Sequence, residues 1–472
     1  MLKRLLMGVL AVLLGGIALL VVAIVAFRPK ETPPVGIDFT RFLAHYSAAS
    51  APTKETFIGV PGAARLQVSC ELAAARLSVQ LNGNNVLTPD SDIDCAQTRE
   101  IPVTLAATNT IAITADEAMP GSASVRIKQR SDVQMHVLSR VHFNANVSSF
   151  KASRAFYGML GFSTLSGFPD TNTQAMARAI GIQTPTSYDG SKGEWAGGYL
   201  LHGELIGLGF PGGAIDLIEF TIPRNVAPPY RQLNHLGMAR AALQTADIDA
   251  DYKLLTAQGV RFLAAPTTRA DGTRFVIFTD PDGIFYELTE VPAADGDNTP
   301  AGTTHLKGFG ALNVNVSDFE RSRAWYQMFG FNVTRTLPDS GTVEVAKAMG
   351  FEAPIKTKGA LLTHAVDGST MELVQWLSPY NPERAYPIPV NHIGIYRTAL
   401  ATTDIVADVA TLKAQGVAFV SPITPCCSGP DSSGSIVAFY DPDGTIVELV
   451  EQPLLSWLMP SLLRMRDFFT AR

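Results

Sequence analysis

Charged residues are scarce in this chain, and lysine and arginine never form a run. Only 17% of the 472 residues are Asp, Glu, Lys or Arg, and the formal net charge is −6. Proteins that follow the phosphate backbone of nucleic acids gather basic side chains on one face or in a basic arm. The sequence has neither feature, so we expect no nucleic-acid partner.

Cysteine is also rare, with four residues in the whole chain. Cys70 and Cys95 lie in one strand-rich segment, where a disulfide would close a loop and persist in an oxidising compartment. Two buried thiols are the alternative. Cys426 and Cys427 are adjacent in a loop rich in Pro, Ser and Gly, and they match no zinc-ligand spacing. We assign no chemistry to this second pair.

One long hydrophobic run is present, at the start of the chain. Residues 5–27 carry no charge, and at about 1.5 Å per residue they cover roughly the 30 Å of a bilayer core. The run is longer than the apolar region of a signal peptide and shows no obvious cleavage site. We therefore predict a single-pass membrane anchor over residues 1–30. Basic residues nearly balance on its two sides, so the predicted periplasmic or extracellular location of the body rests on weak charge asymmetry.

Between the anchor and the main body, the sequence predicts a linker and a small all-β domain. Residues 31–51 are the linker, with a short helix near residues 39–48. Residues 52–132 alternate polar and apolar side chains between turn signals such as Asn82-Gly83, which is typical of a β-sandwich. A weak resemblance to jelly-roll accessory domains leaves either a spacer or a binding role, and the lack of an aromatic platform favours the spacer.

An internal repeat organises the rest of the chain. Residues 233–263 align without gaps to residues 390–420 with seventeen of thirty-one positions identical, and residues 144–162 match residues 313–331. Two homologous units therefore occupy residues 138–291 and 306–452, joined by a linker at 292–305. Each unit repeats a fainter pattern of strand, helix and three strands, so the fold class is α+β, with paired βαβββ modules in tandem. Residues 453–472 are expected to form an amphipathic helix, either on the membrane or packed on the second unit.

Several short motifs resemble those of the vicinal oxygen chelate superfamily, which includes glyoxalase I, bleomycin resistance proteins and extradiol dioxygenases. They are the Asn-His pairs at 234–235 and 391–392, Leu-Gly-Phe at 160–162, and the Asp-Pro-Asp-Gly turns at 280–283 and 441–444, each followed by Glu-Leu. The resemblance covers about two thirds of the chain. It implies open, cup-shaped sheets around a divalent metal.

The resemblance also implies metal ligands on the first and last strands of each module. In the first unit the matching positions are His142, Asp216, His235 and Glu287. In the second unit Ala311 replaces the first histidine, and the other positions are Glu372, His392 and Glu448. Two imidazoles and two carboxylates suit a borderline divalent ion such as Fe, Mn, Ni or Zn. We expect one ion in the first unit and possibly a second in the other, while histidines satisfied within the core are the alternative.

Two functions from different classes follow from this resemblance. The first is metal-dependent lyase, isomerase or dioxygenase-type chemistry on a small oxygen-rich molecule, with Glu287 as the base and Glu448 as its counterpart. Ile277 and Ala438 stand where ring-cleaving members carry a tyrosine, which argues against catechol cleavage. The second is non-catalytic binding or sequestration of a small molecule, as in the resistance proteins, and Ala311 favours it for the second unit. The oligomeric state is not predicted.

Overall fold

The computed structural model describes most of the chain from residue 34 onward. The described residues are 15–19, 21–22, 34–47, 50–70, 74–75, 77–88, 93–94, 98–115, 122–168, 174–182, 200–208, 213–293, 299–339, 341–387, 389–426 and 434–451. In that part of the chain, no helix is both long and apolar enough to cross a membrane. Most of the predicted anchor and all of the predicted C-terminal helix at 453–472 lie outside the described residues, as does Cys95.

The all-β domain is a sandwich of two four-stranded sheets. One sheet has the order β1 (Val35–Ser47), β10 (Ser122–Val133), β3 (Gly62–Cys70), β8 (Arg99–Leu105). The other has the order β2 (Thr53–Ile58), β9 (Thr108–Ala115), β5 (Leu77–Leu81), β6 (Asn84–Leu87), and the short β4 (Ala74–Ala75) and β7 (Ile93–Asp94) pair separately. The inward side chains of the two sheets form a core of their own.

The short helix expected near residues 39–48 is wrong, because this segment belongs to strand β1. β1 pairs with β10 along its length, with a bulge between Thr40 and Phe42. Phe39, Phe42 and Tyr46 are all buried. The extra residue in the bulge changes the two-residue period of a strand to a spacing of three between the two phenylalanines. This spacing imitates one face of a helix.

The body consists of four modules, each with a strand, a helix and then further strands. Module 1 contains β11 (Val137–Asn146), α2 (Phe150–Met159), β12 (Ser163–Gly167), α3 (Gln174–Ala179), β13 (Leu200–Gly207) and β14 (Ala214–Ile222). Module 2 contains β15 (Gly237–Thr245), α4 (Ile248–Ala257), β16 (Arg261–Phe262), β17 (Thr267–Thr268), β18 (Arg274–Thr279) and β19 (Phe285–Glu290). Module 3 contains β20 (Leu306–Asn315), α5 (Phe319–Gln327), β21 (Phe331–Thr336), α6 (Val343–Ala348), β22 (Lys356–His364) and β23 (Thr370–Ser378). Module 4 contains β24 (Gly394–Thr402), α7 (Ile405–Ala414), β25 (Thr424–Cys426), β26 (Gly434–Tyr440) and β27 (Ile446–Glu451).

The modules do not pair in the order expected from the repeat. One sheet runs β12-β13-β14-β11-β24-β27-β26-β25 and so joins module 1 to module 4. The other runs β16-β18-β19-β15-β20-β23-β22-β21, with β17 beside β18, and joins module 2 to module 3. We call these the outer sheet and the inner sheet. The sequence suggested one shared sheet within each repeat unit, but the structure has one sheet shared by the two inner modules and one shared by the two outer modules.

Two asparagine side chains form hydrogen bonds between the modules that share a sheet. The Nδ2 atom of Asn146 in module 1 donates to the carbonyl oxygen of His392, just before module 4, at 2.7 Å. Asn315 in module 3 donates in the same way to the carbonyl oxygen of His235, just before module 2, at 2.7 Å. Both asparagines are buried, so each bond satisfies a polar group that would otherwise be costly to bury. The main chain of the Asn-His motif is therefore part of the contact between modules.

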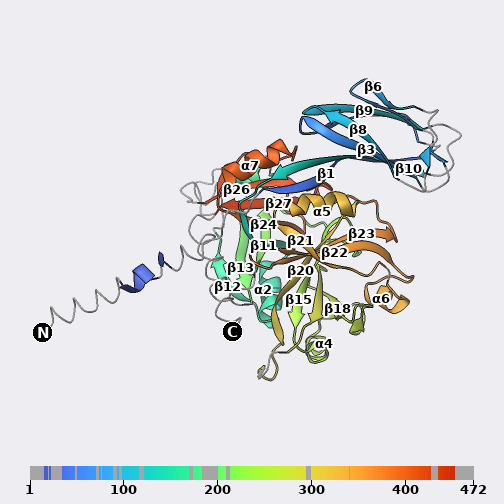
Figure 1. Cartoon of the computed structure of the whole chain (residues 1–472). Coiled ribbons are helices and arrows are strands. Elements are labelled where there is room, and N and C mark those ends of the chain that lie inside the picture. Colours follow the sequence, from blue (N-terminus) through green and yellow to red (C-terminus); the bar gives the residue numbers. More distant parts are fainter. Residues whose placement is uncertain are drawn as a thin grey trace, which may run out of the picture.

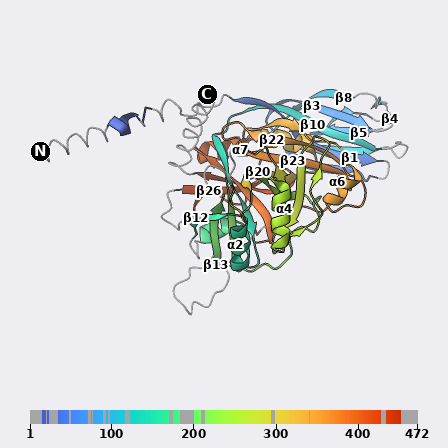
Figure 2. The ribbon, with the colours of Figure 1, turned by 90° about the horizontal axis from the view of Figure 1, so that it is seen from below.

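The sandwich is fixed to the side of the body (Figures 1 and 2). The Arg126 guanidinium of β10 donates to both carboxylate oxygens of Asp318 at the start of α5, at 3.2 and 2.7 Å. Arg41 of β1 donates to the backbone oxygen of Gln415 at the end of α7, at 3.1 Å. These contacts join the sandwich to both the inner and the outer sheet.

Candidate functional site

The N-cap residues of four helices allow equivalent positions in the four modules to be compared. Each cap side chain accepts a hydrogen bond from the backbone N–H three residues later, as N-caps do; the caps are Ser149, Asp247, Asp318 and Asp404. The residue seven positions earlier lies on the first strand of each module. These residues are His142, Arg240, Ala311 and Arg397.

A carboxylate on the last strand of each module stands beside this position. The last strand runs parallel to the first, and the paired residues are Asn144 with Asp216, Ala242 with Glu287, Asn313 with Glu372, and Ala399 with Glu448. In all four modules the residue opposite the carboxylate comes two positions after the reference residue. Because side chains alternate across a strand, the reference residue and the carboxylate share one face of the sheet.

The outer site combines His142, Asp216, Arg397 and Glu448. The Arg397 guanidinium lies between the two carboxylates, with Nη2 at 2.8 Å from Asp216 Oδ2 and Nε at 2.9 Å from Glu448 Oε1. His142 Nε2 is 3.8 Å from Asp216 Oδ2. The four side chains are 14%, 4%, 6% and 3% exposed in this order. An arginine therefore occupies the centre of this group of ligand-type side chains.

Burial sets the protonation of the outer site. Burial, and then the nearby Arg397, lower the pKa of His142 to about 3, so its imidazole is neutral at pH 7. Burial raises the pKa of Asp216 to about 7; Arg397 opposes this rise and Glu448 adds to it. Asp216 therefore changes charge near neutral pH.

The inner site is built around Glu287, which two guanidinium groups hold. Arg240 Nε donates to Glu287 Oε2 at 2.9 Å, and Arg269 donates to both carboxylate oxygens, each at 2.9 Å. Thr289 Oγ1 adds a bond of 3.0 Å to Oε1. Burial alone would raise the pKa of Glu287, but Arg269 and Arg240 outweigh it and hold the pKa well below its usual range. Arg240 also donates, through Nη2, to Glu372.

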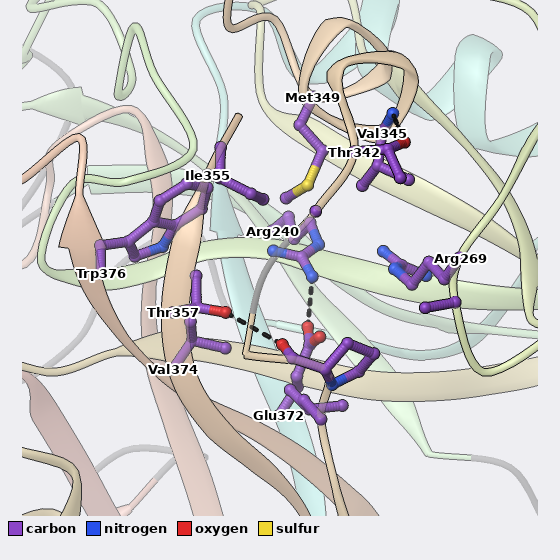
Figure 3. Close-up of a pocket in the computed structure, with 14 residues that line it drawn as sticks. Arg240, Arg269, Thr342, Val345, Met349, Ile355, Thr357, Glu372, Val374 and Trp376 are labelled. Atoms are coloured by element: carbon purple, nitrogen blue, oxygen red, sulfur yellow. Dashed lines mark hydrogen bonds and ion pairs between the residues drawn. The ribbon is translucent and has the colours of Figure 1, made fainter. Parts of the chain in front are cut away.

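A pocket of about 70 Å³ opens on the inner site. Figure 3 shows Arg240 directed at Glu372, with Trp376, Ile355 and Met349 along the wall. The wall is contributed by module 3, while Arg240 and Arg269 come from module 2. Arg240 is only 3% exposed, and the side chain of Glu372 is 17% exposed. The pocket therefore has an apolar wall and a floor formed by an ion pair.

The side chains of His235 and His392 lie in a stack of rings outside these two sites. His235 stacks on Tyr230 with ring centroids 3.9 Å apart, Tyr230 stacks on Tyr386 at 3.9 Å, and Tyr386 stacks on His392 at 4.6 Å. His235 Nε2 is 3.0 Å from a carboxylate oxygen of Glu383, which is an exposed side chain. The structure thus places these two predicted ligands in the contact between modules and apart from the carboxylates of the strands.

The seven predicted ligands are divided among three places. His142, Asp216 and Glu448 meet in the outer site, Glu287 and Glu372 in the inner site, and His235 and His392 in the ring stack. Within the described residues, no group of three or more His, Cys, Asp and Glu side chains could hold a metal ion. A guanidinium separates the carboxylates in both sites, and a second positive charge at that point would be repelled. The arranged residues do not fit a divalent ion.

Three arginines of these sites were not predicted. Arg240 and Arg397 occupy the first-strand position that the sequence analysis gave to His235 and His392, five residues earlier. The signal that identifies them is the constant distance of seven residues to the helix N-cap. Arg269 lies in the hairpin before β18 and has no such marker.

Comparison with known proteins agrees with this architecture. The sequence profile of the Glyoxalase/Bleomycin resistance protein/Dioxygenase superfamily matches residues 139–288 and 308–449, which is more than half of the chain. The chain belongs to this superfamily. A comparison with curated proteins finds no significant match.

Solved structures that match this chain are distant in sequence. A glyoxalase I variant from Zea mays is 18% identical, with a TM-score of 0.45, over 66% of this chain and 93% of that one. A putative dioxygenase from Bacillus subtilis subsp. subtilis str. 168 is 13% identical, with a TM-score of 0.44, over 68% and 86% of the two chains. A 4-hydroxymandelate synthase variant from Streptomyces coelicolor is 16% identical, with a TM-score of 0.22, over 70% and 100%.

Proposed function

We propose that this protein binds a small molecule in the inner pocket and holds its polar end with Arg240 and Glu372. The observation that carries the proposal is the position of the Arg240 guanidinium between Glu287 and Glu372, at the floor of the pocket. A guanidinium at this point can polarise and orient an oxygen ligand by charge-assisted hydrogen bonds. Together with Arg269, it supplies the positive charge of the inner site.

The chemistry of the pocket points to a ligand with an apolar body and a neutral polar group. Trp376, Ile355 and Met349 offer apolar contact. Among the bonds formed between described residues, Arg240 uses Nε and Nη2, and Glu372 uses Oε2, so Nη1 and Oε1 are left for a ligand. A hydroxyl or a carboxamide can bind both, because each group donates and accepts. Two guanidinium groups and two carboxylates already balance in charge, and an ionised ligand would add an uncompensated charge.

Binding without turnover is supported over metal-dependent lyase, isomerase or dioxygenase-type chemistry. Glu287, the predicted base, is held in its ionised form by two arginines and is a weak proton acceptor for that reason. Glu448, its counterpart, is paired with Arg397. Loading the full chain with Fe, Mn, Ni or Zn tests the competing function directly. One retained ion per chain that is lost in His142→Ala would favour the enzyme.

The ligand class is tested with three probes that share a ring and differ in the polar group: benzyl alcohol, benzamide and benzoate. Isothermal titration calorimetry on the full chain should detect the two neutral probes and show weaker binding of benzoate. Arg240→Met should weaken the neutral probes at least tenfold. Arg335→Met is the matched control, because Arg335 pairs with Asp271 at 47% exposure on the same sheet. Equal binding by native protein and Arg240→Met would overturn the proposal.

We further propose that residues 5–27 anchor the chain in a membrane with the body on the oxidising side. The uncharged run supports the anchor. Cys70 and Cys426 each form a disulfide bond, which supports an oxidising compartment. A reporter that is active only in the periplasm, fused after residue 472 in a bacterial host, should be active. A silent reporter with intact expression would contradict this orientation.

A further inference from the structure

We propose that Arg397 is the built-in cation of the outer site, and that its removal turns His142, Asp216 and Glu448 into a transition-metal site. The three side chains come from three strands of the outer sheet, β14, β11 and β27, and Arg397 comes from β24, which lies between β11 and β27. Its guanidinium contacts one oxygen of each carboxylate, at 2.8 and 2.9 Å. The rigid sheet therefore keeps three ligand-type groups around one cationic side chain.

The guanidinium does not satisfy all the polar atoms around it. Within the described part of the chain, neither ring nitrogen of His142 has a hydrogen-bond partner, and the same holds for Asp216 Oδ1. The side chain of Asp216 is 4% exposed. Leaving a buried acceptor or donor without a partner destabilises the folded state.

A divalent ion would match the charge and the donors that remain without Arg397. When both are ionised, the two carboxylates carry two negative charges, and a neutral imidazole contributes a nitrogen donor without further charge. One imidazole and two carboxylates suit Zn²⁺ or Co²⁺ and leave a coordination position for water. In the native chain the guanidinium occupies this space and repels a second cation.

The inner site provides the matched comparison, because it has the same geometry and a different donor set. Removing Arg240 leaves Glu287 bound by both nitrogens of Arg269. Ala311 occupies the position equivalent to His142. Without an imidazole, and with one carboxylate still neutralised, the inner site should not gain affinity for a transition metal.

The test uses Co²⁺ with the full chain and its Arg397→Ala variant. We expect the variant to bind one Co²⁺ per chain, with visible absorption bands typical of low-coordinate Co²⁺ and a higher melting temperature in its presence. Native protein and Arg240→Ala should bind none at the same concentration. The double variant Arg397→Ala with His142→Ala should bind at least tenfold more weakly than Arg397→Ala. Arg397→His is a second variant that adds an imidazole at the same place and should bind more tightly.

Two results would overturn the proposal. If native protein already binds one Co²⁺ and loses it in His142→Ala, Arg397 does not block the site. If neither Arg397→Ala nor Arg397→His binds Co²⁺ or is stabilised by it, the three side chains do not form a site. A variant that unfolds without metal and folds with Co²⁺ supports the proposal, because metal binding then supplies folding free energy.

Discussion

Replacing Arg240 with methionine tests the inner ion-pair network. The substitution keeps an unbranched apolar stem and removes the charge that Glu287 and Glu372 share. Arg240 is 3% exposed, and its bond to Glu287 is fully buried. Removing one partner of a buried ion pair typically costs 3–5 kcal/mol, because the other charge loses its compensation.

The structure places this substitution at the lower end of that range. Glu287 keeps two bonds from Arg269 and one from Thr289. The side chain of Glu372 is 17% exposed at the pocket, so water can hydrate it in part. We therefore expect a loss of about 3 kcal/mol. Because the inner and outer sheets share one hydrophobic core, the body of roughly 300 residues should unfold together, and this loss corresponds to a fall in melting temperature of roughly 5 °C.

The assay is differential scanning calorimetry of native protein, Arg240→Met, Glu372→Gln and the double variant. A double-mutant cycle isolates the interaction between the two side chains. Arg240→Met should cost less in the Glu372→Gln background, because no charge is then left unpaired at Glu372. The exposed pair of Arg335 is the control, and Arg335→Met should change stability by less than about 1 kcal/mol. A loss below about 0.5 kcal/mol for Arg240→Met, or the same loss in both backgrounds, would refute the reasoning.

Three other predictions concern the connections and the outer site. Asp318→Ala should lower the free energy of unfolding by about 2 kcal/mol and speed proteolysis of the sandwich, because Asp318 both caps α5 and binds Arg126. The control Ser149→Ala removes a cap alone and should cost about 1 kcal/mol. Equal effects of the two variants would contradict a role of Asp318 in holding the sandwich to the body. Asn315→Leu should cost about 2–3 kcal/mol by leaving carbonyl oxygens unpaired between modules, and an unchanged denaturation midpoint would exclude this. Burial raises the pKa of Asp216 in the folded state, so the stability it contributes is present below pH 4 and is lost as pH rises to about 7. The stability of native protein relative to Asp216→Asn should therefore fall between pH 4 and 7, and a flat difference would contradict the raised pKa.

The family resemblance, and not local patterns alone, pointed to part of the candidate site. It named the four last-strand carboxylates, and all four lie at equivalent positions of the sheets. His142 was placed correctly on the first strand of module 1, in contact with Asp216. The matching first-strand positions in modules 2 and 4 were missed because the Asn-His motif is more conspicuous than a single arginine. The repeated distance to the helix N-cap is a local signal that identifies both arginines.

The internal repeat in the sequence did not predict which module shares a sheet with which. In both sheets the first strand of one module pairs with the first strand of another, so the order of elements within a module does not identify its partner. Selection between the possible partners depends on a few long-range contacts, such as Asn146 with the segment before module 4 and Asn315 with the segment before module 2. These contacts join residues that are 80 or more positions apart.

The sequence by itself indicated the family and the repeated modules, since both depend on short motifs and their spacing, and the family resemblance then implied the carboxylates on the last strands. Only the tertiary structure decided that module 1 meets module 4, and that Arg240 and Arg397 lie among those carboxylates. The physical reason is that a carboxylate can bind either a metal ion or a guanidinium. Which cation it receives depends on the strand that pairs beside it, and that pairing is made across the whole length of the body.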